Sequence, residues 1–178
     1  GACGVLPAVL VPYFQKRCRD TDKILKAMYV AAGIGQIIAT RSSISGAAGG
    51  CQAEIGSASS MAAGALTYLQ GGNCEQIATA AAMAMKNLLG LVCDPVAGLV
   101  EVPCVKRNVI GTVNAMACAD MAMAGIVSRI PPDQVMDAMK EVGDKMDASL
   151  RETALGGLAR TEEGVKIAEK MHASQENW

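Results

Sequence analysis

Residues 41–72 read RSSISGAAGGCQAEIGSASSMAAGALTYLQGG, and the expected fold is built around this stretch. Its first part, 41–50, consists of small and flexible residue types that are typical of a loop. From Gln52 to Gln70 apolar residues recur with the helical period, which predicts a helix. The pair Gly71-Gly72 then provides a common signal for the end of that helix.

Charged residues are unevenly distributed along the chain. Between residues 42 and 85 only Glu54 and Glu75 are charged, whereas residues 133–176 are rich in Asp, Glu, Lys and Arg. Because charged side chains are seldom buried, we expect a buried middle and a solvated end. The 16 basic and 17 acidic residues give a net charge of −1, and this balance offers a nucleic-acid partner little electrostatic support.

The rest of the chain also predicts helices, and the alternation of a strand is absent from the pattern. Asp20 or Thr21 is expected to cap the second helix and Asn73 the fourth, and Asp94-Pro95 resembles an N-cap followed by a proline at the first helical position. We therefore expect a single all-α domain over residues 1–178, with six to eight helices. Besides the helix at 52–70, the expected helices cover 5–17, 21–40, 74–89, 105–127, 131–146 and 162–172.

The composition indicates closely packed, buried helices. Aromatic residues make up only 3% of the chain, and Ala, Gly and 11 Met residues must fill the core. The run from Val109 to Ser128 is nearly apolar, but Asn114 and Asp120 would be costly in lipid, so we expect a buried helix and no membrane partner. On the same helix, Met116, Met121, Met123 and Cys118 are expected to be core residues.

Three of the seven cysteines share a context, because each lies where a loop is expected to meet a helix. Cys51 follows two glycines, Cys93 precedes Asp94, and Cys104 follows Pro103. Backbone N–H groups at such junctions favour thiolates, and three thiolates can hold an iron–sulfur cube while one iron stays open as a Lewis acid. The absence of a C-x-x-C motif argues against a zinc ribbon or a ferredoxin. On spacing alone, the interpretation as three small buried core residues is favoured over a metal site.

The other cysteines are Cys3, Cys18, Cys74 and Cys118. An odd total of seven cannot pair completely within the chain, and the first residues have no basic region typical of a signal peptide. We therefore expect reduced cysteines and a cytoplasmic protein.

Polar residues near these cysteines are candidates for catalysis. Ser45, ahead of Ser42 and Ser43, could act as a base or proton relay, although loop serines often bond the local backbone instead. Lys106, Arg107 and Asn108 follow Cys104, and a cation there, Lys106 above all, could balance a cluster or clamp a carboxylate, although this stretch could also be an exposed helix start.

Four further expectations concern charged residues outside these motifs. Glu54 is expected to pair with a cation such as Lys106, Arg107 or Lys86, because a buried carboxylate needs a partner. Arg151 and Glu152 are interpreted as ion pairs that pin a loop. The single histidine, His172, and the acidic residues Asp144 and Asp147 are expected at the surface.

Four segments resemble the alpha chain of iron–sulfur-dependent L-serine dehydratase, in the order that the family has them. They are GACGVLPAVL at 1–10, RSSISGAAGGCQAEIGSASSMAA at 41–63, KNLLGLVCDPVAGLVEVPCVKRN at 86–108 and SLRETALGGLA at 149–159. The resemblance implies that Cys51, Cys93 and Cys104, in the GCQ, CDP and VPC motifs, are the ligands of a [4Fe-4S] cluster. It implies conversion of L-serine to pyruvate and ammonia by β-elimination, without pyridoxal phosphate.

The resemblance also implies partners. The family carries a further helical segment before the GACG motif and a small α/β domain or a separate beta chain, so this chain is expected to be the C-terminal part of the cluster-binding domain and to need those parts for activity. A homo-oligomer is expected. Single-chain members end in a cysteine that reaches the cluster, whereas here no cysteine follows Cys118, as in the two-chain type.

Three other functions stay open from the sequence. A cluster-dependent L-cysteine desulfidase would use the same open iron with sulfide as the leaving group. A non-catalytic metal or redox-sensing module would hold its cluster with four protein ligands. A metal-free helical interaction domain would hold none.

Overall fold

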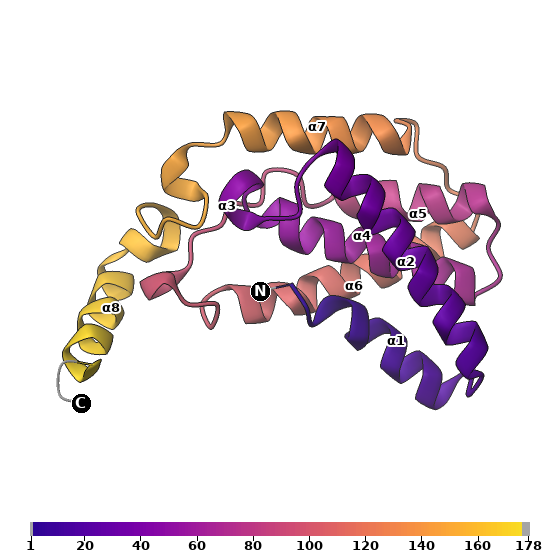
Figure 1. The fold of residues 1–178 in the computed structure, drawn as a ribbon, viewed down its shortest axis with the longest axis horizontal. Coiled ribbons are helices and arrows are strands. Elements are labelled where there is room, and N and C mark those ends of the chain that lie inside the picture. Colours follow the sequence, from indigo (N-terminus) through magenta and orange to yellow (C-terminus); the bar gives the residue numbers. More distant parts are fainter. Residues whose placement is uncertain (1, 176–178) are drawn as a thin grey trace.

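The computed structural model describes residues 2–175, and within that range it contains helices and loops but no strand. This confirms the predicted all-α class and the number of helices. In Figure 1 the helices form an arch, with α7 along the top and α1 and α8 at its two lower ends. The α-helices are α1 (Val5–Lys16), α2 (Thr21–Arg41), α3 (Gly46–Gly49), α4 (Ser57–Leu69), α5 (Cys74–Lys86), α6 (Cys104–Met123), α7 (Pro132–Lys145) and α8 (Glu162–Gln175).

Helix α4 is the centre of the core, because it packs against α1, α2, α5 and α6. Ten of its 13 residues are buried, and most of them are Ala, Gly or Ser, whose small side chains let neighbouring backbones come close. Two buried hydroxyls bond to those neighbours: Ser59 Oγ donates to Gly111 O at 2.8 Å and Ser60 Oγ to Ala81 O at 2.8 Å. The prediction of a buried middle is therefore confirmed.

The predicted capping residues lie at the starts of α2 and α5 and just after the end of α4. Asp20 accepts a hydrogen bond from Lys23 N at 3.1 Å, and Asn73 and Gln76 form a reciprocal capping box at the start of α5. Gly71 follows α4 with a φ of +90°, a backbone conformation that only glycine adopts without strain.

The segment from Arg41 to Gln70 differs from the prediction in two places. The expected loop contains the short helix α3, because Ser45 O accepts a hydrogen bond from Gly49 N at 3.0 Å and closes a helical turn. The expected helix at 52–70 starts as a π-helical turn, Gln52–Gly56, before α4 begins. Single π-turns inside longer helices often occur at functional sites.

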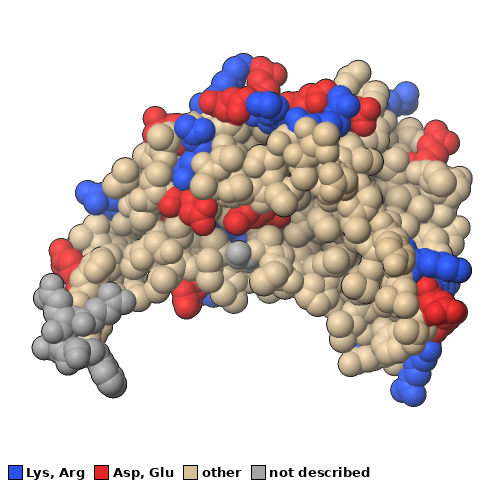
Figure 2. Space-filling model, in the orientation of Figure 1, with Lys and Arg blue, Asp and Glu red and all other residues tan. Residues whose placement is uncertain are grey.

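Helix α7 covers the core with one face and meets solvent with the other. Val135, Met136 and Met139 are buried against Ile38 and Met85. Charged side chains line the opposite side of α7, along the upper edge of the molecule in Figure 2. The predicted solvated end of the chain is therefore confirmed for this helix.

Helix α6 is only partly buried, so the prediction that the apolar run 109–128 forms a buried helix is wrong for one of its faces. Met116, predicted to be a core residue, is 48% exposed, whereas Cys118 is fully buried. The helix packs on one side only, because nothing among the described residues covers the other side. No helix of the described chain is long and apolar enough to cross a membrane. The exposed apolar residues of α6 are Val105, Val109, Ile110, Val113 and Met116.

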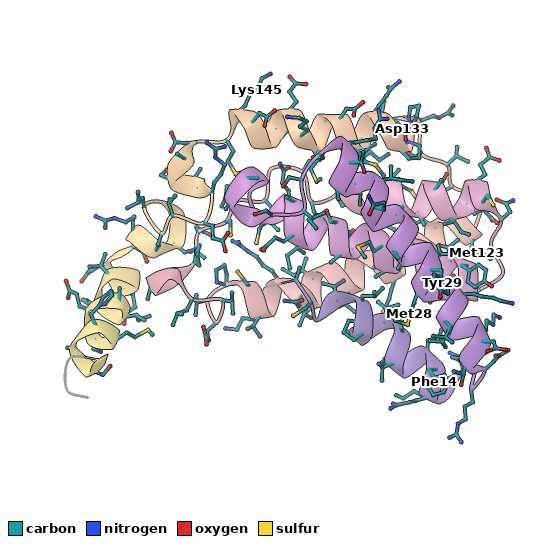
Figure 3. The ribbon with its side chains drawn as sticks, in the orientation of Figure 1. Phe14, Met28, Tyr29, Met123, Asp133 and Lys145 are labelled. Atoms are coloured by element: carbon teal, nitrogen blue, oxygen red, sulfur yellow. The ribbon has the colours of Figure 1, made fainter. Side chains whose placement is uncertain are left out.

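Helices α1 and α2 enclose a second apolar surface. Phe14 and Met28 both lie at the end of the molecule where these helices are joined (Figure 3), and they line an apolar groove of about 290 Å³. Met28 and its neighbour Tyr29 are 49% and 78% exposed. Exposed apolar surface of this extent often marks contact with another chain or segment.

Candidate functional site

Three buried thiols from distant segments meet near the N-terminal end of α6. Cys51 lies between α3 and the π-turn, Cys93 lies in the loop after α5, and Cys104 is the first residue of α6. The Sγ atoms of Cys51 and Cys93 and a carboxylate oxygen of Glu54 all lie within 4.8 Å of one another. Cys104 lies near enough to Cys51 for the negative charge of Cys51 to contribute to raising the pKa of Cys104. The relative exposures are 0%, 1% and 2% for Cys51, Cys93 and Cys104.

Buried hydrogen bonds hold the Cys51 segment in place. Gln52 is 1% exposed, and its amide donates to Met139 O at 3.0 Å and accepts from Gly90 N at 2.9 Å. This one side chain therefore ties the π-turn to α7 and to the loop that carries Cys93. Gly49 and Gly143 make the close approach of α3 and α7 possible, since a Cβ on Gly143 would lie 2.9 Å from Gly49 Cα.

The backbone on both sides of Cys93 is paired with the segment around Arg151. Cys93 N donates to Leu150 O at 2.8 Å, and Glu152 N donates to Cys93 O at 2.8 Å, as in a single rung of a parallel ladder. The prediction of ion pairs at Arg151 and Glu152 is wrong, since neither residue has one within the described chain. The segment around Arg151 does hold the loop that carries Cys93 in place. It does so through backbone hydrogen bonds to Cys93 and not through side-chain ion pairs.

A buried ion pair adjoins the thiols. Arg107 donates from Nη2 to Asp94 Oδ1 at 2.9 Å and from Nη1 to Val92 O at 2.7 Å. Asp94 Oδ2 accepts from Leu158 N at 2.8 Å, and the side chains of Arg107 and Asp94 are only 12% and 5% exposed. The prediction that Asp94 caps a helix at its own position is wrong, because its carboxylate reaches across the fold instead. Pro95 is the N-cap of the short 3₁₀ turn that follows.

These surroundings shift the pKa values of the thiols in opposite directions. The pKa of Cys51 is lowered to about 6, because Cys93 donates a hydrogen bond to its sulfur and the Arg107 guanidinium lies near, although burial opposes the shift. The same hydrogen bond and burial raise the pKa of Cys93. Burial, with the negative charge of Cys51, raises the pKa of Cys104 to about 11. The site therefore favours a first negative charge on Cys51, next to the arginine.

Glycine at position 46 leaves space at the thiols. A Cβ built on Gly46 would lie 3.1 Å from Cys93 Sγ and 3.2 Å from the carboxylate of Glu54, tighter than ordinary van der Waals contact. A side chain at this position would therefore enter the space between the thiol and the carboxylate. Sequence reasoning missed this residue, although its place in the glycine run before Cys51 was a signal that could have found it.

Glu54 has no ion pair among the described residues, so the predicted pairing is wrong. Arg107 is bonded to Asp94, and Lys86 donates to Ser128 Oγ at 2.9 Å. Lys106 is exposed. The α6 residue that faces the thiols is thus Arg107, because consecutive residues on a helix point in different directions.

The two proposed catalytic residues lie at the margin of the site. Ser45 is exposed, and its backbone N–H donates to Ser43 Oγ at 3.1 Å, so Ser43 makes the local bond expected of a loop serine. Ser45 directly precedes Gly46, the position at which a Cβ would lie 3.1 Å from Cys93 Sγ. Lys106 has no hydrogen bond or ion pair within the described chain. Catalysis by Ser45 or Lys106 stays a prediction.

One predicted core residue and three predicted surface residues are found where expected. Cys118 is buried in α6, and burial raises the pKa of its thiol to about 11. His172, Asp144 and Asp147 are exposed, and Lys140 pairs with Asp144 at 2.6 Å. All seven cysteines are free.

The known proteins that this chain resembles in sequence are serine dehydratases. Residues 1–159 match the family described as serine dehydratase alpha chain. A probable L-serine dehydratase alpha chain of Latilactobacillus sakei is 53% identical over 94% of this chain and 80% of its own length. The L-serine dehydratase alpha chain of Peptoniphilus asaccharolyticus is 50% identical over 94% of this chain and 57% of its own length.

A longer relative, the L-serine dehydratase TdcG of Escherichia coli, is 47% identical over 89% of this chain. The aligned region is 36% of that protein, so this chain spans about a third to four fifths of the relatives compared. Because the family match extends over most of the chain, this protein belongs to the serine dehydratase alpha chain family.

Proposed function

We propose that this chain is the cluster-binding part of an L-serine dehydratase, a lyase that converts L-serine to pyruvate and ammonia. The observation that carries the proposal is the convergence of Cys51, Cys93 and Cys104, three buried thiols from three separate segments. Family membership supports the reaction, because relatives over the same residues are named L-serine dehydratases.

The residues present fit a [4Fe-4S] cluster. Cys51, Cys93 and Cys104 would hold it by three thiolates, which are the protein ligands that such clusters prefer. The space kept by Gly46 and the positive charge of Arg107 suit a bulky anionic group. When bound, the cluster supplies an open iron that acts as a Lewis acid on the substrate hydroxyl.

The protein groups around the thiols orient the site and exclude water. Asp94 holds the guanidinium of Arg107 beside Cys51, so a positive charge stays next to the sulfur that is deprotonated most easily. Burial of all three cysteines keeps bulk water away, which strengthens the electrostatic interactions inside the site. A base is still needed for the α-proton, and Ser45 and Lys106 stay the candidates, without pyridoxal phosphate.

We propose that activity also requires a beta chain or a further α/β domain of the same enzyme, and that the enzyme is a cytoplasmic homo-oligomer. The naming of relatives as alpha chains supports a second chain. The exposed apolar face of α6 and the groove between α1 and α2 support contact with further protein.

The proposal is tested by anaerobic reconstitution of the complete enzyme with iron and sulfide. We expect about four irons and four sulfides per alpha chain, in keeping with the [4Fe-4S] stoichiometry. L-serine should change the visible absorbance of the cluster and yield pyruvate and ammonia. L-cysteine turnover faster than L-serine turnover would favour the desulfidase instead. A fully loaded protein that does not respond to either amino acid would favour a metal or redox-sensing module.

Replacing Gly46 by alanine is expected to lower the iron content with little change in the folding of the metal-free chain. The added methyl group would press on Cys93 Sγ and on Glu54, in the space that the cluster needs. Iron and sulfide analysis after reconstitution measures the effect, and thermal unfolding of the metal-free protein measures folding.

Gly33→Ala is the matched control, because a Cβ at this α2 position would meet nothing within 4 Å. It should leave the iron content unchanged and stabilise the helix by about 0.5–1 kcal/mol. Equal iron contents in the two variants would contradict the assigned role of Gly46.

A further inference from the structure

A cavity of about 400 Å³ opens beside the thiol site, between α2 and the π-turn. Its size falls within the range of roughly 300–1,000 Å³ that is usual for small-molecule sites. Most of its lining is apolar or small, and a few polar side chains interrupt that lining. Residues that line it include Ala32, Gln36, Ile44, Glu54, Ser57 and Met61.

Glu54 connects this cavity to the thiols. Its side chain lines the cavity, and one of its carboxylate oxygens lies within 4.8 Å of the sulfurs of both Cys51 and Cys93. The residue is only partly exposed, yet it has no ion pair among the described residues. A partly buried carboxylate without a partner is costly, so a cationic group on a bound molecule would satisfy it.

Ser57 provides an independent observation at the same cavity. The residue is 3% exposed, and its Oγ is a buried side-chain oxygen that has no hydrogen-bond partner within the described chain. Buried hydroxyls are nearly always bonded, so an unpaired one in a cavity wall points to a polar ligand. Ser57 lies one helical turn beyond Glu54, which places both side chains on the same side of their helix.

We propose that this cavity binds the amino-acid substrate, with its α-ammonium group on the carboxylate of Glu54 and a second hydrogen bond at Ser57. This inference rests on the proposed function and adds the residue that selects an amino acid over a hydroxy acid. Glu54 is suited to that role because it lies between the cavity and the thiols, so an ammonium group bound there brings the rest of a small substrate close to Cys51 and Cys93. A carboxylate and an ammonium form a charge-assisted hydrogen bond, which is among the stronger polar contacts.

The test compares two ligands on the complete, anaerobically reconstituted enzyme. L-serine and 3-hydroxypropanoate share a hydroxyl and a carboxylate, but only L-serine has the ammonium group. Each is titrated while the visible absorbance of the cluster is followed, and the KM for L-serine is measured separately. In Glu54→Gln, L-serine should bind about 10- to 100-fold more weakly, whereas 3-hydroxypropanoate should bind as before.

Two further variants separate binding from structure. Ser57→Ala should weaken the binding of L-serine by about 2- to 10-fold, since it removes one neutral hydrogen bond. Glu169→Gln is the matched control, because Glu169 is exposed on α8, and it should behave as the unmodified enzyme does. Iron and sulfide are counted in every variant.

Each outcome supports or overturns the assignment. Selective loss of L-serine binding in Glu54→Gln, with full iron content, supports it. Loss of iron in that variant shows that Glu54 serves the cluster instead, and equal weakening of both ligands shows a structural role, so either result overturns it. If the unmodified, loaded enzyme does not respond to L-serine, the proposed function itself fails. If that enzyme responds and Glu54→Gln responds equally, only the present inference fails.

Discussion

A Cys93→Ala variant is expected to lose nearly all of its cluster iron, and with it the dehydration of L-serine. Cys93 is buried against Cys51, and no further cysteine lies close enough among the described residues to replace it. A metal acting as Lewis acid contributes several kcal/mol to such a reaction, so the rate should fall by at least about a hundredfold. Iron and sulfide analysis and pyruvate formation measure the two effects. Cys51→Ala and Cys104→Ala should behave in the same way.

Cys118→Ala is the matched control for these variants. Cys118 is as deeply buried as the three site cysteines, but it lies within the core-facing side of α6. Its replacement should leave iron content and turnover unchanged, because only packing and weak contacts with Asn87 and Asn114 are lost. A Cys93→Ala protein that still binds four irons per chain would refute the assignment of the ligands.

The Asp94→Ala variant should show the largest loss of stability. Removal of the carboxylate leaves Arg107 buried without its partner and Leu158 N without its acceptor. Breaking a buried ion pair from one side costs about 3–5 kcal/mol, because the remaining charge is still out of water. Urea unfolding of the metal-free protein measures this loss directly, apart from any effect on the cluster.

Asp137→Ala is the matched control, because it removes another aspartate from an arginine pair. Asp137 bonds Arg41 at 2.8 Å, but these side chains are 53% and 37% exposed. Surface pairs contribute about 0–1 kcal/mol, so this loss should be several times smaller than that of Asp94→Ala. Similar losses of unfolding free energy in the two variants would show that the buried Asp94–Arg107 pair stabilises the fold no more than a surface pair does.

Local patterns in the sequence predicted most of the helices. The apolar period, the N-caps Asp20 and Asn73 and the stop at Gly71 act over a few residues, and all of them were found in the structure. The errors occurred where a distant segment competes with a local rule. Asp94 has the local features of an N-cap, yet its carboxylate bonds Arg107 and Leu158. Met116 has the apolar character of a core residue, yet it faces outward.

Periodicity and motifs are properties of neighbouring residues, and they were enough to predict the all-α class, the family and the three cysteines of interest. Which groups meet depends on the three-dimensional packing of the helices. It brought Cys51 and Cys93 together with Cys104 near them, put Arg107 rather than Lys106 beside Cys51, and left Glu54 without an ion pair among the described residues. These contacts join residues far apart in the chain, so they depend on how α3, α6 and α7 pack around α4. A local sequence pattern does not predict that packing.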